Sequence, residues 1–273
     1  MPVSRKYIEF KKGKIAYTSS GKGRAVVLLH GFLGSADTWE ETRAALAKQF
    51  RVICIDLPGH GQSDCFGYIH SMELMAQSVK TVMDKLRFKK YVLVGHSMGG
   101  YASLAFAELF PDQLRGFCLF HSTAFADSEQ KKQDRNKAIR AVKSNYNIYV
   151  RATIKNLFAT QNLKYYKKEI LLTQQIARKT PKRGVVAALE GMKARPNRDV
   201  ILHFVNYPVL FIIGKYDNIL PMQSLLDQTV FLKKKNVLLL ESSGHMGFLE
   251  QPDTCLKSLK RFIRQSFGSR SSA

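Results

Sequence analysis

The chain has 273 residues, which allows one large domain or two small ones. Apolar residues make up 45% of it, so a sizeable core can be buried, and this argues against wholesale disorder. The 43 lysines and arginines against 21 acidic residues give a net charge of +22, which favours an acidic partner or ligand.

Several classes of protein are excluded or disfavoured. No apolar run approaches the roughly 18 residues that cross a bilayer, and the first residues lack the apolar segment of a secretory signal. The four cysteines are far apart and form no C-x-x-C pair, which predicts neither a zinc site nor a disulfide framework. We therefore expect a cytoplasmic protein with reduced thiols, no metal and no cofactor. The cysteines are Cys54, Cys65, Cys118 and Cys255.

Short β-branched runs alternate with helical stretches in the N-terminal part. The expected strands are Tyr7–Phe10, Ile15–Thr18, Ala25–Leu29, Val52–Ile55, Tyr91–Val94 and Gly116–Phe120. The first two should form a hairpin turned at Lys12-Gly13. The expected helices are Thr38–Lys48, opened by the capping signal Asp37-x-x-Glu40, then Met72–Leu86, and then Met98–Phe110, which Pro111 stops. This alternation predicts an α/β fold with a mostly parallel sheet.

The pattern changes over residues 122–200, where no strand is expected. Helices are predicted near 128–145, 147–159 and 163–179, and another is opened by Thr180-Pro181. The later elements are strands Val209–Ile213 and Val237–Leu240 and helices Met222–Lys234 and Pro252–Phe267. We thus predict an eight-stranded, mostly parallel sheet flanked by helices, with a helical cap inserted after the sixth strand. The predicted domains are core residues 1–121, the cap 122–200, core residues 201–267 and a disordered tail 268–273.

A G-x-S-x-G motif lies between a predicted strand and a predicted helix. It is formed by Gly95, Ser97 and Gly99, and the two glycines allow a turn too tight for larger side chains. Such a turn exposes the Ser97 hydroxyl at the carboxyl end of the sheet. The motif alone is weak, and its setting between strand and helix strengthens the assignment of Ser97 as a nucleophile.

A serine nucleophile needs a base and an acid that orients the base, and in this type of site they follow the serine in the order acid, then histidine. His245 follows the eighth predicted strand, where it can reach back to Ser97, whereas His203 precedes the seventh. Asp217 closes the seventh strand and fits the acid. The alternatives are that Asp217 is an ordinary turn residue and that His245 is an exposed loop histidine.

The reaction also needs N–H donors for an oxyanion. We expect one to be the backbone N–H of Met98, at the start of the helix after Ser97, and the other that of Phe32, in the loop after the third strand. His30, in the same loop, is expected to be structural.

Five segments together resemble the α/β-hydrolase superfamily over essentially the whole chain. They are HGFLGS at 30–35, DLPGHGQSD at 56–64, GHSMGG at 95–100, GKYDNILP at 214–221 and SGHMGFLEQP at 243–252. The resemblance is to small capped serine carboxylesterases, including carrier-protein methyl-ester esterases. It implies that residues 56–64 form a structural loop whose turn is held by hydrogen bonds to Asp56, and that His60 is not catalytic. Ser97 at the turn disfavours dehalogenases and epoxide hydrolases, which carry aspartate there.

The expected function is hydrolysis of small or medium carboxylic esters through an acyl-enzyme. A carrier-protein methyl-ester esterase, a lactonase, a lyase like that of menaquinone biosynthesis and a cofactor-free haloperoxidase-like enzyme stay open as alternatives. A non-catalytic ligand-binding protein on the same scaffold is the least favoured, because binding alone does not need a triad. Acyl chain length, leaving group and oligomeric state are not predicted.

The cap is unusually basic, with 18 basic against 6 acidic residues. A solvated charged surface is the plainest explanation. The alternative is a dock for an anionic substrate or an acidic partner such as an acyl carrier protein, with the basic face outward. Nucleic acid is not expected, because no aromatic and basic motif of a known binder is present, and no membrane partner is expected. The basic residues in question are Lys131, Lys132, Arg135, Arg140, Lys143, Lys164, Lys167, Lys168, Lys182 and Arg183.

Overall fold

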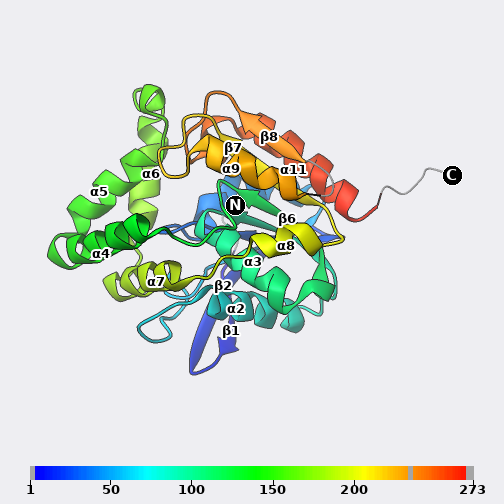
Figure 1. Ribbon diagram of the computed structural model, residues 1–273. Coiled ribbons are helices and arrows are strands. Elements are labelled where there is room, and N and C mark those ends of the chain that lie inside the picture. The colour runs from blue at the N-terminus through cyan, green and yellow to red at the C-terminus, as the bar shows by residue number, and fades with distance from the viewer. Residues whose placement is uncertain (1–3, 233–235, 269–273) are drawn as a thin grey trace.

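A computed structural model describes residues 4–232 and 236–268 (Figure 1). Its centre is one eight-stranded sheet with the order β1-β2-β4-β3-β5-β6-β7-β8. Strands β1 and β2 form an antiparallel hairpin, β2 pairs antiparallel with β4, and all the other pairs are parallel. The predicted fold class is therefore confirmed. The strands are β1 (Lys6–Phe10), β2 (Gly13–Ser20), β3 (Ala25–Leu29), β4 (Arg51–Ile55), β5 (Tyr91–His96), β6 (Leu114–Phe120), β7 (Val209–Gly214) and β8 (Val237–Leu240).

Every residue of β3, β5 and β7 is buried, so both faces of the sheet are covered. Helices α1 and α11 contact each other, as do α2 and α3. The helices of this core are α1 (Glu40–Ala47), α2 (Met72–Lys85), α3 (Met98–Leu109), α9 (Met222–Gln228), α10 (Gly247–Glu250) and α11 (Pro252–Ser266). Single 3-10 turns are Ala36–Trp39, Pro111–Gln113, Thr160–Asn162 and Thr229–Phe231.

Five helices lie between β6 and β7, and we call this segment the insertion. Figure 1 shows α4 to α7 as a group at one side of the sheet, in green and yellow-green. They are α4 (Glu129–Ser144), α5 (Tyr146–Asn156), α6 (Lys167–Arg178), α7 (Lys182–Ala194) and α8 (Asp199–Phe204). Helix α8 runs across the domain boundary predicted at residue 200, and the division into core and cap stays a prediction.

Two of the predicted helix starts are wrong. The start signal at Asp37 is not the cap, because the Ser35 hydroxyl accepts the Asp37 N–H and a 3-10 turn precedes α1. Pro181 rather than Thr180 is the N-cap of α7. The helix expected from Met222 ends as an α-helix at Gln228, and its predicted end at Lys234 lies in residues 233–235, outside the described part. Nearly all of the predicted disordered tail lies in residues 269–273, which are also outside it. Helices α8 and α10 were not predicted.

The order of the sheet locates the site. The chain passes from β3 outward to β4 and then back to β5 on the other side of β3. Open α/β sheets bind ligands at the carboxyl ends of strands where the order reverses in this way. The loops after β3 and β5, which carry Phe32 and Ser97, therefore meet at the favoured edge. In the described residues, no helix is long and apolar enough to pass through a bilayer.

Candidate active site

Ser97 lies in a strained turn between β5 and α3. Its φ of 49° and ψ of −112° place it in a region that L-residues rarely adopt. A Cβ at Gly95 would lie 2.3 Å from the Gly99 carbonyl oxygen, and one at Gly99 would lie 2.4 Å from that of Leu29. The two glycines therefore permit the turn, and the Ser97 N–H anchors it by donating to the Phe120 carbonyl at 2.9 Å. Ser97 is left half-buried at the edge of the sheet.

Asp217 and His245 form a buried pair. The distance between His245 Nδ1 and Asp217 Oδ2 is 2.7 Å. The other oxygen, Oδ1, accepts the backbone N–H groups of Ile219 and Leu220 at 2.8 and 3.0 Å. Burial alone raises the pKa of Asp217, but the charge and hydrogen bond of His245 and the other neighbours outweigh it and lower the pKa to about 2. Asp217 is therefore a carboxylate at neutral pH, and its partner nitrogen is Nδ1 of His245.

The backbone of His245 is held on both sides. Its N–H donates to the Leu157 carbonyl at 2.7 Å, and its carbonyl accepts from His96 Nε2 at 2.9 Å. The buried carboxylate of Glu250 accepts the N–H of Gly244 at 2.9 Å and also the N–H of Ala159 at 3.0 Å. Glu250 thus ties the histidine loop to the insertion. Sequence reasoning missed this residue, although it lies within the conspicuous segment at 243–252.

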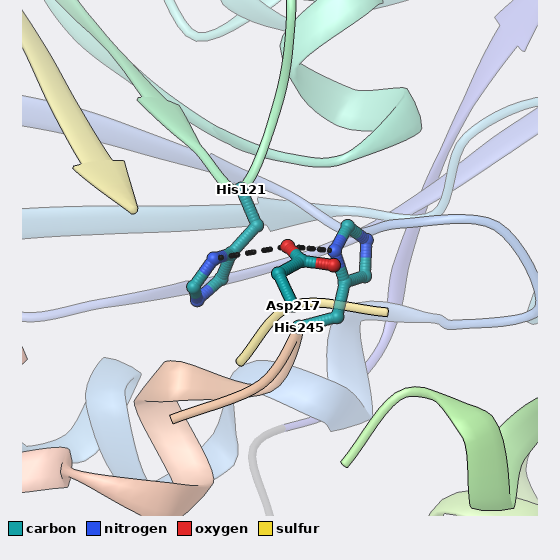
Figure 2. A group of neighbouring side chains, drawn as sticks. All are labelled: His121, Asp217 and His245. Atoms are coloured by element: carbon teal, nitrogen blue, oxygen red, sulfur yellow. Dashed lines mark hydrogen bonds and ion pairs between the residues drawn. The ribbon is translucent and has the colours of Figure 1, made fainter. Parts of the chain in front are cut away.

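His121 is a second imidazole beside Asp217 that sequence reasoning missed (Figure 2). It follows β6, is completely buried, and has its Nδ1 at 3.5 Å from Asp217 Oδ2. Its Nε2 accepts the Gly247 N–H at 3.1 Å, so the ring proton is on Nδ1 and faces the carboxylate. Burial lowers the pKa of His121 to about 3, which keeps the ring neutral. The signal that could have found it is its place directly after β6, because residues that follow adjacent parallel strands, here β6 and β7, meet at one edge of the sheet.

His121, Asp217 and His245 are also the one group among the described residues whose ligand atoms lie close enough to hold a metal ion, within 4.8 Å of one another. The hydrogen bonds of the two histidines explain why these three side chains lie together without a metal ion. Nδ1 of His121 carries a proton, and Nδ1 of His245 is bonded to Asp217. A cation at this point would have to displace both protons, so the donor set fits a hydrogen-bonded cluster better than a metal centre.

The predicted oxyanion donors lie at the same edge. In the described part of the chain, neither the Phe32 N–H nor the Met98 N–H has a hydrogen-bond acceptor. The loop that carries Phe32 is shaped by His30, which is fully buried and whose Nε2 accepts the Leu57 N–H at 2.9 Å while Nδ1 donates to the Gly31 carbonyl at 2.8 Å. His30 is thus structural, as predicted.

The loop of residues 56–64 is also built as the resemblance implied. Asp56 accepts the N–H groups of Ala36 and Gln62 at 2.7 and 2.9 Å. His60 is buried within the loop, and its Nδ1 contacts the Pro58 carbonyl at 3.1 Å. Neither side chain lines the cavity described next.

A cavity of about 390 Å³ lies between the core and the insertion. Ser97, His245 and Phe32 line it from the core side, and residues of α4, α5 and α7 line it from the other. The basic residues of the predicted cap differ in their position relative to the cavity. Lys164, Lys167 and Lys168 are exposed and do not line the cavity, whereas Lys131 and Arg135 do. The expectation that the basic face looks only outward is therefore wrong for these last two.

The family follows from a match that covers most of the chain. Residues 24–252 match the model of the alpha/beta hydrolase fold family. The chain belongs to the α/β-hydrolase family. Within it, the chain is similar to a thermophilic esterase from Thermogutta terrifontis, with 28% identity, a TM-score of 0.91, and coverage of 96% of this chain and 99% of that one.

Two curated relatives extend the comparison. A putative 2-succinyl-6-hydroxy-2,4-cyclohexadiene-1-carboxylate synthase of Bacillus subtilis is 26% identical over 91% of this chain and 93% of its own length. The dihydrolipoyllysine-residue acetyltransferase component of the acetoin cleaving system of Pseudomonas putida is 28% identical over 89% of this chain. The chain spans 64% of that relative, which is less than two thirds of its length.

Proposed function

We propose that this α/β-hydrolase cleaves carboxylic esters through an acyl-enzyme, with Ser97, Asp217 and His245 as its triad. The observation that carries the proposal is that Ser97 and His245 line one cavity while Asp217 holds Nδ1 of His245 from behind. Nε2 is then the ring nitrogen left to serve Ser97. A serine on a strained turn, a histidine and a buried carboxylate are together the parts of a nucleophilic acyl-transfer site.

The proposed reaction has two halves. Ser97 Oγ bonds to the ester carbonyl carbon while its proton passes to His245 Nε2. The oxyanion is bound by the Phe32 and Met98 N–H groups, the bond to the alcohol breaks, and His245 gives its proton to that alcohol. Water, deprotonated by His245, then attacks the acyl-enzyme and releases the acid and Ser97. Asp217 stays ionised throughout and stabilises the imidazolium.

A fluorophosphonate probe tests the proposal directly. We expect the folded protein to react in a one-to-one ratio, with the label on the peptide that contains Ser97, because the probe requires an activated serine. Protein unfolded by heat before exposure is the control and should remain unlabelled. Labelling of several serines, or none, would remove the basis for a serine hydrolase and favour a binding protein on the same scaffold.

A second candidate is a synthase reaction that forms no acyl-enzyme, of the class that the printed name of the Bacillus subtilis relative indicates. Ester turnover separates the two. A protein that hydrolyses p-nitrophenyl acetate and accumulates an acyl-enzyme in a rapid-mixing experiment follows the first scheme. A protein that binds the probe but turns over no ester follows the second.

Three buried groups near Ser97 should not contribute to the pH dependence of the rate between pH 5 and 8. Asp217, with its pKa lowered to about 2, and His121, with its pKa lowered to about 3, keep their charge states above pH 4, and burial lowers the pKa of His96 well below its usual range. The Asp217 carboxylate is therefore lost only in strongly acidic solution, and none of these groups should produce a step in kcat/KM for p-nitrophenyl acetate over that range. A step between pH 5 and 8 that disappears in His121→Asn would contradict this assignment.

A further inference from the structure

We propose that the α4 wall of the cavity binds a negatively charged group of the substrate, so that the preferred esters carry a carboxylate away from the bond that is cleaved. This rests on the proposed function for the cleavage itself, but not for the binding. The binding residues are Lys131 and Arg135, which lie one helical turn apart on α4 and both line the cavity that contains Ser97.

The first support is an excess of positive charge beside the cavity. Asp127 is the carboxylate partner of two guanidiniums, those of Arg135 and Arg195. Arg195 is buried, bonds Asp127 at 2.6 Å, and lies 4.0 Å from the ring centroid of Tyr101, another cavity residue. Burial raises the pKa of Asp127, but the two arginines outweigh it and lower the pKa, so the carboxylate stays charged. One negative charge therefore faces two positive ones beside the cavity.

The second support is that donors remain available. Arg135 uses Nε and Nη2 on Asp127, and its Nη1 has no hydrogen-bond partner in the described part of the chain. Likewise, Lys131 Nζ has no acidic partner among the residues described. The neighbouring Lys132 differs on both counts, because its Nζ pairs with Glu129 at 2.7 Å and it does not line the cavity.

The remaining lining does little to neutralise this charge. Among the described residues that line the cavity, Asp134 is the one acidic side chain; it is exposed and pairs with Lys137 at 3.3 Å. Much of the rest of the wall is apolar. Apolar walls lower the local dielectric, so an anion near Lys131 and Arg135 is attracted more strongly than it would be in water. The apolar lining residues are Ala138, Leu157, Leu189, Met192 and Ile219.

Two esters of one acid test the proposal, monomethyl glutarate and dimethyl glutarate, which differ by one charge and one methyl group. We expect wild type to have the higher kcat/KM with monomethyl glutarate, measured as methanol release. Lys131→Gln should lower that value about tenfold, the effect of losing one charge-assisted hydrogen bond in a partly exposed site, and Lys131→Glu should lower it further. The kcat/KM for dimethyl glutarate should change less than twofold in these two variants. Lys132→Gln is the matched control and should leave both values unchanged.

Binding of glutarate itself, measured by calorimetry, separates this proposal from the proposed function. Glutarate should bind wild type and Lys132→Gln, and its affinity should fall about tenfold in Lys131→Gln. If neither ester is cleaved but glutarate binds in this pattern, the ester hydrolase is wrong and the anion site stands. If dimethyl glutarate is cleaved as fast as the monoester, or if Lys131→Gln changes neither turnover nor affinity, the α4 wall does not select anions and Arg135 serves only to hold Asp127.

Discussion

Replacing Ser97 with alanine should lower kcat for p-nitrophenyl acetate by about 10⁴ to 10⁶, since the loss of a triad nucleophile removes covalent catalysis altogether. Folding should be retained. The Ser97 hydroxyl has no hydrogen-bond partner in the part of the chain that the structure describes, and alanine keeps the Cβ that the turn already accommodates. The two measurements are initial rates with the ester and the midpoint of thermal unfolding, which should move by no more than a few degrees.

Two further variants make this result specific. His245→Ala should be as inactive as Ser97→Ala, and the double variant should be barely worse, because residues that act as a unit give non-additive losses. Ser144→Ala, at the exposed end of α4, should retain wild-type rates. Full activity in Ser97→Ala would show that ester cleavage takes place elsewhere on the chain.

Asp217→Asn should lower kcat by about 10⁴ through the tautomer of His245. The backbone N–H groups of Ile219 and Leu220 both donate to Oδ1, so the amide oxygen of asparagine will take that place. The amide NH₂ then faces His245 Nδ1, which must accept rather than donate. The ring proton moves to Nε2, where it prevents the nitrogen from taking the proton of Ser97.

The tautomer can be observed separately from the rate. Nitrogen NMR of labelled histidine should show His245 protonated on Nδ1 in wild type and on Nε2 in Asp217→Asn. Asp227→Asn is a suitable control, because Asp227 is exposed on α9 and bonds only Gln223 among the residues described. A loss of less than tenfold in Asp217→Asn, or an unchanged tautomer, would mean that Asp217 does not orient the base.

The strands of the core could be predicted closely from the sequence. Ala25–Leu29 and Val237–Leu240 have their predicted ends because continuous apolar runs between turn residues leave little freedom in where a buried strand begins and ends. The residues at which helices begin were harder to predict. A capping signal such as Asp37-x-x-Glu40 competes with a neighbouring serine, and only the packed structure shows that Ser35 provides the cap.

The residues of the candidate site were likewise predictable only in part. The pairing of Asp217 with His245 was expected from the order of motifs along the chain, and the structure brings the two within hydrogen-bond distance. His121 carries no motif and reaches Asp217 only because β6 pairs with β7 in the folded sheet. Lys131 could not be separated from Lys132 in the sequence, since the direction of α4 relative to the cavity depends on tertiary packing.

The hydrogen bond from the His245 N–H to the Leu157 carbonyl bears on how such proteins can be recombined. Together with the contact of the Ala159 N–H with Glu250, it makes residues 157–159 part of the support of the histidine loop. Gly244 packs so closely there that an added Cβ would lie 2.4 Å from the Ala159 nitrogen. A chimera that takes its helical segment from another family member must therefore exchange this stretch and the histidine loop as one unit. A graft that joins one parent's loop to the other parent's stretch should misplace the base even when both halves fold.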